Sequence, residues 1–178
     1  MKVKIISDST CDLSPALLEK YDIAVTPLSV LLKDRSLRDG IEIVPDDIYD
    51  FVAQYGTLPK TSAVNVLEYA EVFQQWHEQG YDIVQFNISS DFSSSYQSAC
   101  IAAQKWENVY VVDSRNLSTG QGLLVLHGAE MAQRGCSAKK IYEECTRLAE
   151  RVEASFVIDS VDYLYKGGRC SALAALGA

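Results

Sequence analysis

Histidine is almost missing from this sequence of 178 residues, which holds two. They are His77 and His127, fifty positions apart, so neither belongs to a cluster spaced like zinc ligands. The five cysteines are also scattered, and no pair is spaced as C-x-x-C. An odd, unpaired set argues against a disulfide framework and favours buried thiols of small apolar character. These cysteines are Cys11, Cys100, Cys136, Cys145 and Cys170.

Positive charge is also in short supply. Sixteen Lys and Arg against 24 Asp and Glu give a net charge of −8. Binding to nucleic acid or to an anionic membrane surface needs a basic face, so both are disfavoured. No apolar run approaches the ~20 residues that span a bilayer. The opening segment 1–8 is too polar for a secretory signal, so we expect a cytoplasmic protein without membrane insertion.

Apolar residues make up 48% of the chain, enough for a folded core. Short β-branched runs alternate with stretches of helical pattern, which predicts an α/β fold with a mostly parallel sheet and flanking helices. We expect strands at 3–6, 23–25, 83–88, 109–112 and 155–158. A hairpin is expected over 28–38, and 57–62 is expected to be a loop. Helices are expected at 15–20, 45–55, 64–78, 96–106, from Ser118 or Thr119 to 134, and at 137–152.

Hydroxyl side chains dominate the segments that follow these strands and the helix expected at 45–55. In a parallel sheet, the segments after the strands gather at the carboxyl edge, where ligands bind. Hydroxyls and free helix N–H groups suit a carboxylate or a phosphate. Helix capping is the simpler explanation for any single serine. The residues are Ser7, Ser9, Thr10, Thr61, Ser62, Ser89, Ser90, Ser93, Ser94, Ser95, Ser114, Ser118 and Thr119.

Known catalytic and nucleotide motifs are missing. The sequence has no G-x-S-x-G elbow and no Walker A motif, and Gly120-Gln121-Gly122 has Val125 where a dinucleotide fingerprint needs a third glycine. A serine nucleophile would need a base, and no histidine is near these loops in sequence. Asp8 and Asp113 could act as paired acids, but acceptance of backbone N–H groups is the favoured interpretation.

Five segments in order resemble the DegV family. They are Ser7-Asp8-Ser9-Thr10-Cys11-Asp12-Leu13, Lys60-Thr61-Ser62, Ser89 to Ala99, Val112 to Gly122, and Leu164-Tyr165-Lys166-Gly167-Gly168-Arg169. The resemblance implies a bacterial fatty-acid-binding protein that serves as the acyl-binding subunit of fatty acid kinase. It implies no catalytic residue, no metal and no cofactor, with a long-chain fatty acid as ligand.

By the same resemblance, Thr61 and Ser93 hold the carboxylate, with Ser62, Ser94 and Ser95 beside them. The acyl chain is expected in an apolar tunnel. An ATP-binding kinase subunit is the expected partner, and Arg169 is a candidate contact with that partner or with the head group. The family's Gly-Thr stands here as Ser94-Ser95, so the loop is expected to differ in shape, since glycine takes positive φ cheaply.

Two domains are implied: a DegV-like α/β domain over 1–152 and the beginning of a second α/β domain over 153–178, which in the family continues further.

A rival hypothesis remains open. The serine loops could act directly in a hydrolase or phosphotransferase on a small carboxylate or phosphate substrate, and turnover without a partner would indicate this.

Overall fold

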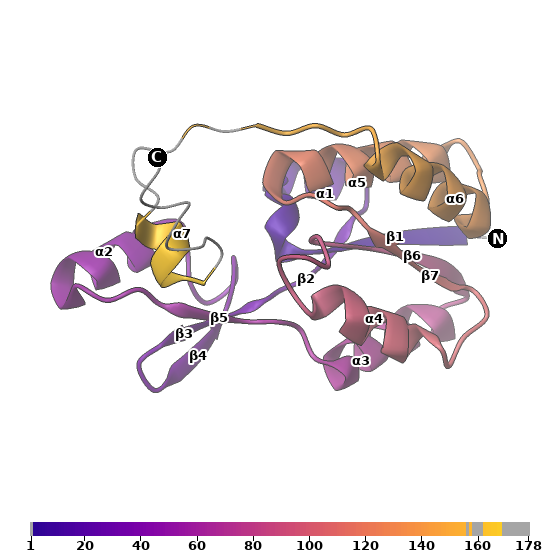
Figure 1. Ribbon diagram of the computed structural model, residues 1–178. Helices are drawn as coiled ribbons and strands as arrows, with labels where there is room; N and C mark the ends of the chain where they lie inside the picture. Colours follow the sequence, from indigo (N-terminus) through magenta and orange to yellow (C-terminus); the bar gives the residue numbers. More distant parts are fainter. Residues whose placement is uncertain (1, 156, 158–161, 169–178) are drawn as a thin grey trace. The chain divides into compact units, whose positions relative to one another are not determined.

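The computed structural model describes residues 2–155, 157 and 162–168. The chain divides into two compact units. The first comprises Met1–Leu28 and Ala63–Ala154, and the second Ser29–Ser62 with the residues from Ser155 onward. Each unit has its own sheet, and each is described below by itself (Figure 1).

The first unit is built on a four-stranded parallel sheet in the order β2-β1-β6-β7. Its strands are β1 (Lys2–Asp8), β2 (Ala24–Thr26), β6 (Tyr81–Asn87) and β7 (Val109–Asp113). β1 and β6 are buried along most of their length, as expected for central strands covered on both faces. The predicted α/β class and parallel sheet are confirmed.

Helices cover both faces of this sheet (Figure 1). One face carries α1 (Pro15–Lys20), α5 (Ser118–Gln133) and α6 (Ala138–Ala149), and the other α3 (Val66–Glu78) and α4 (Ser95–Ala103). In α6 the buried residues are Ala138, Ile141, Cys145 and Ala149, whose spacing places them on one side of the helix. Each face therefore encloses a separate hydrophobic core.

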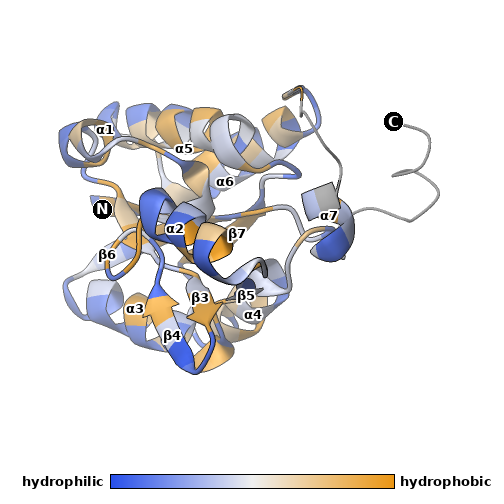
Figure 2. Cartoon of the chain, turned by 90° about the vertical axis from the view of Figure 1, so that its left-hand side faces the viewer, coloured by the Kyte–Doolittle hydropathy of each residue, from blue (hydrophilic) through white to orange (hydrophobic). Residues whose placement is uncertain are grey.

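The second unit has a three-stranded antiparallel sheet in the order β4-β3-β5. The strands are β3 (Ser29–Leu32), β4 (Arg35–Arg38) and β5 (Lys60–Ser62), and the helices are α2 (Pro45–Tyr55) and α7 (Asp162–Lys166). Val30, Leu37 and Ile43 form a small core, against which Ile48 of α2 packs. Figure 2 shows hydrophobic and hydrophilic segments alternating along α2, which has no fully buried residue but keeps Ile48, Phe51 and Val52 half-buried.

Two expectations differ from this organisation. The expected first domain, 1–152, spans both units: it ends close to Ala154, but residues 29–62 belong to the second unit. The reason is that β3, β4 and β5 bond to one another and not to the parallel sheet.

The expected loop over 57–62 is wrong at its end, because residues 60–62 pair with β3 as β5. Of the strand expected at 155–158, Ser155 and Val157 are not in a strand, and the other two residues lie outside the described part of the chain.

Candidate anion site at the carboxyl edge of the parallel sheet

The carboxyl ends of β1 and β6 lie side by side in the first unit. From β1 the chain continues through α1 to β2 on one side, and from β6 through α4 to β7 on the other. The strand order therefore reverses between β1 and β6. In doubly wound sheets, ligands bind in the crevice outside such a reversal point.

Asp8, the last residue of β1, holds the loops at this point together. Its Oδ2 accepts the backbone N–H of Ile88 at 2.8 Å, and its Oδ1 accepts Nε2 of Gln121 at 2.8 Å. Oδ1 also accepts the N–H of Thr10 at 3.3 Å and lies 2.6 Å from the Thr10 hydroxyl. Asp8 is fully buried, and this burial raises the pKa of its carboxyl, although the hydrogen bonds from Thr10, Gln121 and Ile88 act in the opposite direction.

The loops after β6 and β7 are also joined. The N–H of Ser89 donates to the carbonyl of Asn116 at 2.9 Å. Oδ1 of Asp113 accepts the backbone N–H groups of Ser90 and Arg115 at 3.2 and 3.0 Å. The interpretation of Asp8 and Asp113 as acceptors for loop N–H groups is confirmed, and hydrogen bonds join the loops after β1, β6 and β7.

The segment 88–95 between β6 and the start of α4, called the serine loop below, holds three hydroxyls that differ in burial. Ser95 is fully buried, Ser93 half-buried and Ser94 exposed. The hydroxyl oxygens of Ser93 and Ser95 lie 3.1 Å apart, the N–H of Ser95 donates to Ser93 Oγ at 3.2 Å, and the N–H of Val64 donates to Ser95 Oγ at 3.3 Å. Ser94 has φ −77°, so this position makes no demand for glycine.

Two helices that begin at this edge, α4 and α5, have neither a side-chain cap nor an acidic residue at their N-termini. α4 starts after Ser94 and α5 after Leu117. The expected cap at Ser118 or Thr119 is therefore wrong. Ser14, Asn65 and Ser137 cap α1, α3 and α6 by their side chains, and α2, which has no side-chain cap, carries Asp46 and Asp47 in its first turn. Uncapped N–H groups and a positive dipole end favour an anion at α4 and α5.

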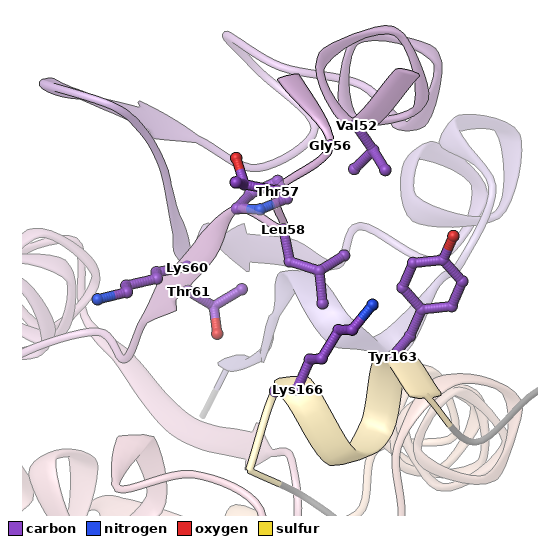
Figure 3. A pocket seen from close by; sticks show the side chains of 10 residues that line it. Val52, Gly56, Thr57, Leu58, Lys60, Thr61, Tyr163 and Lys166 are labelled. Carbon is purple, nitrogen blue, oxygen red and sulfur yellow. The ribbon is translucent and has the colours of Figure 1, made fainter. Parts of the chain in front are cut away.

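Thr61 and Ser62 lie in β5 of the second unit, where both are exposed. Thr61 lines a cavity of about 690 Å³, a size typical of small-molecule sites. Its apolar wall comes from the end of α2, the segment before β5, and α7. Figure 3 shows Leu58 extending toward Tyr163 and Lys166, with Val52 above them.

Of the predicted site residues, the structure brings together Ser93, Ser94 and Ser95 on one loop. Thr61 and Ser62 belong to the other unit. They precede Val64 by three and two residues, and the N–H of Val64 donates to Ser95 Oγ. Arg169 lies outside the described residues. The residues of the cavity wall share no local sequence pattern, because they come from a helix end, a loop and a distant segment.

Neither histidine is positioned to serve these serines. His77 lies in the last turn of α3, where it contacts Trp106, and His127 lies in the second half of α5. Among residues 2–155, 157 and 162–168, no group of His, Cys, Asp and Glu side chains is arranged to hold a metal ion. The four described cysteines form no disulfide with one another.

Comparison with known proteins identifies the family of this chain. A family model described as an uncharacterised protein of the DegV family matches residues 2–177. A DegV domain-containing protein from Clostridium perfringens is 36% identical over 172 residues, covering 96% of this chain and 62% of the relative. The chain thus spans less than two thirds of this curated relative.

Solved structures show the same fold. A stearic acid-binding protein from Eubacterium ventriosum has a TM-score of 0.82 and 36% identity, over 98% of this chain and 63% of that one. A DegV family protein from Thermus thermophilus, described as binding fatty acid, has a TM-score of 0.85 and 32% identity, over 95% and 61%. No helix in the described part of this chain is long and apolar enough to cross a membrane. Matched along nearly its whole length, the chain belongs to the DegV family.

Proposed function

We propose that this chain binds a long-chain fatty acid. The hydroxyls of Thr61 and Ser93 hold the carboxylate, with Ser62, Ser94 and Ser95 completing the cradle. The chain presents the bound acid to a separate ATP-binding kinase subunit, which forms the acyl phosphate. No other cofactor is part of this proposal.

The observation that carries the proposal is the start of α4. The helix opens behind Ser93 and Ser94 with no side-chain cap and no carboxylate in its first turn. Ser93 Oγ accepts the N–H of Ser95, and an anionic head group would supply an acceptor for the N–H groups of the next residues of α4, with the nearby hydroxyls as additional neutral partners. The relatives whose structures bind fatty acid share this fold over at least 95% of the chain.

The cavity beside Thr61 supports the placement of the tail. Val52, Leu58, Pro59 and Tyr163 offer it an apolar wall, and Thr61 lies in the same lining. Burial of ~15 methylenes at ~0.8 kcal/mol each contributes about 12 kcal/mol before ordering costs. Each neutral hydroxyl bond adds only ~1 kcal/mol. The tail would therefore dominate affinity, and the hydroxyls would set the orientation of the carboxylate.

The test separates retention of lipid from presentation of the carboxylate. The variants Thr61→Ala and Ser93→Ala should retain most bound fatty acid, measured by native mass spectrometry, but support much less acyl phosphate formation with a DegV-associated kinase and ATP. Thr146→Ala on α6 and Ser36→Ala on β4 are matched controls, since both side chains are exposed and outside the site. Full acyl phosphate formation by both site variants would refute the assignment.

The same assay without kinase tests the rival hypothesis, that the serine loops act directly as a hydrolase or phosphotransferase. A hydrolase or phosphotransferase would turn over an ester or ATP with the purified chain alone. Partner-independent turnover that disappears in Ser93→Ala would replace the binding proposal with a serine-loop enzyme.

A further inference from the structure

The cavity of the second unit is lined by positive charge without negative charge. Its ten described lining residues include two lysines, Lys60 and Lys166, and no aspartate or glutamate. The chain as a whole has the opposite bias, with 24 acidic against 16 basic residues. Because a concave surface lined by one sign of charge concentrates ligands of the opposite sign, this cavity favours anions.

The two lysines of the lining differ in direction. Figure 3 shows the amine of Lys166 between Leu58 and Tyr163, whereas the side chain of Lys60 extends to the opposite side, away from them. Nζ of Lys166 lies 5.9 Å from the centroid of the Tyr163 ring, at the far end of the range of a cation–π contact. Lys166 is therefore the charge that faces a ligand in the cavity.

The ammonium of Lys166 lacks a strong partner of its own. In the described part of the chain, none of the ion pairs involves Lys166. Lys4, by comparison, pairs with Asp22 Oδ1 at 2.6 Å and lies over the Trp76 ring at 4.1 Å. A distant tyrosine ring is a weaker partner for an ammonium than a carboxylate or a phosphate. An anion in the cavity would supply this stronger partner to Lys166.

The rest of the lining suits an anion that carries an apolar tail. Lys166 shares the lining with Thr61, and both belong to the second unit. Val52, Leu58 and Pro59 add apolar surface. The four-carbon stem of a lysine can pack against apolar groups while its ammonium meets a charged one. The lining thus combines the two surfaces that a single-chain anionic lipid needs, one for its tail and one for its head group.

We propose that Lys166 is a specificity-determining residue of this cavity, whose ammonium pairs with the anionic head group of the bound lipid. The proposal rests on the fatty acid function above and deepens it, because it names the charge that selects an ionised lipid over a neutral one. A phosphate head group carries more negative charge than a carboxylate, so Lys166 holds an acyl phosphate more tightly than the acid from which it forms.

The test compares lipids that share a tail and differ in charge. Dissociation constants for palmitate, hexadecyl phosphate and hexadecanol are measured with the wild-type chain, Lys166→Met and Lys166→Arg. Methionine keeps an unbranched apolar stem and removes the charge. Because water screens the exposed ammonium, Lys166→Met should weaken palmitate binding roughly two- to fivefold. Hexadecyl phosphate should lose more, hexadecanol should lose nothing, and Lys166→Arg should recover most of both losses.

The matched control is Lys33→Met. Lys33 also lies over a tyrosine ring, that of Tyr55 at 3.5 Å, but it is not part of the cavity lining, so this variant should leave all three affinities unchanged. Equal losses for palmitate and hexadecanol in Lys166→Met, or no loss for either, would overturn the inference while fatty acid binding stands. A wild-type chain that binds none of the three lipids would refute the proposed function and this inference together.

Discussion

Replacement of Asp8 by alanine should destabilise the first unit strongly. The carboxylate of Asp8 accepts from the N–H groups of Ile88 and Thr10 and from the side-chain amides of Gln121 and Asn87. Each buried donor left without an acceptor costs ~1–3 kcal/mol. Removal of a buried carboxyl, whose pKa is raised by desolvation, returns part of this cost. We expect a net loss of about 3 kcal/mol in the free energy of unfolding.

Urea denaturation followed by tryptophan fluorescence measures this loss, because Trp76 and Trp106 both lie in the first unit. For a chain of this length, ~3 kcal/mol corresponds to a decrease in Tm of roughly 6–12 °C. The matched control is Asp91→Ala, an exposed aspartate in the serine loop, which should change stability by less than ~0.5 kcal/mol. If Asp8→Ala were no less stable than this control, Asp8 would not hold the loops together.

Three further outcomes are expected. Because burial raises the pKa of Asp8, the fold is more stable with this carboxyl protonated: that part of the stability is full below pH ~3.9 and is lost as the pH rises through the raised value. Asp8→Asn should lack this decline of up to ~1.4 kcal/mol per pH unit, and parallel stability curves of the two proteins between pH 4 and 7 would contradict the prediction. Burial raises the pKa of Cys145 to about 12, so Ellman's reagent should reach this thiol at pH 8 only after unfolding, since about 10⁻⁴ of it is thiolate. In Gly128→Ala the new Cβ would lie 2.7 Å from Cζ of the buried Phe86, so urea titration should show a loss of ~1–3 kcal/mol, against no loss for the exposed Gln133→Ala.

Local signals in the sequence were sufficient for most elements. As predicted, α1 begins at Pro15, and α2 runs from Pro45 to the residue before Gly56, which takes φ +66°. Proline at the first helical position and glycine just past the end act on the backbone of their own neighbours. Such signals can be interpreted without knowledge of the fold.

Features that depend on distant partners could not be predicted in this way. β5 is a strand because Thr61 pairs with Val30, thirty-one residues earlier. Gln121 reaches Asp8 across 113 residues, and no spacing rule connects them. The serine loop was located by its motif, but the contrast between buried Ser95 and exposed Ser94 emerges only from packing. The carboxylate-holding roles of Thr61 and Ser93 stay predictions.

The antiparallel pairing of β3 with β5 has a consequence for how the fold could have been assembled. Ser29 and Ser62 are register partners, so the polypeptide leaves and rejoins the parallel-sheet unit through adjacent strands. A segment whose two ends lie close together can be inserted into a domain or removed from it while the rest of that domain keeps its fold. Splicing Leu28 to Ala63 through a short glycine linker should therefore give a smaller protein that still folds around its four parallel strands.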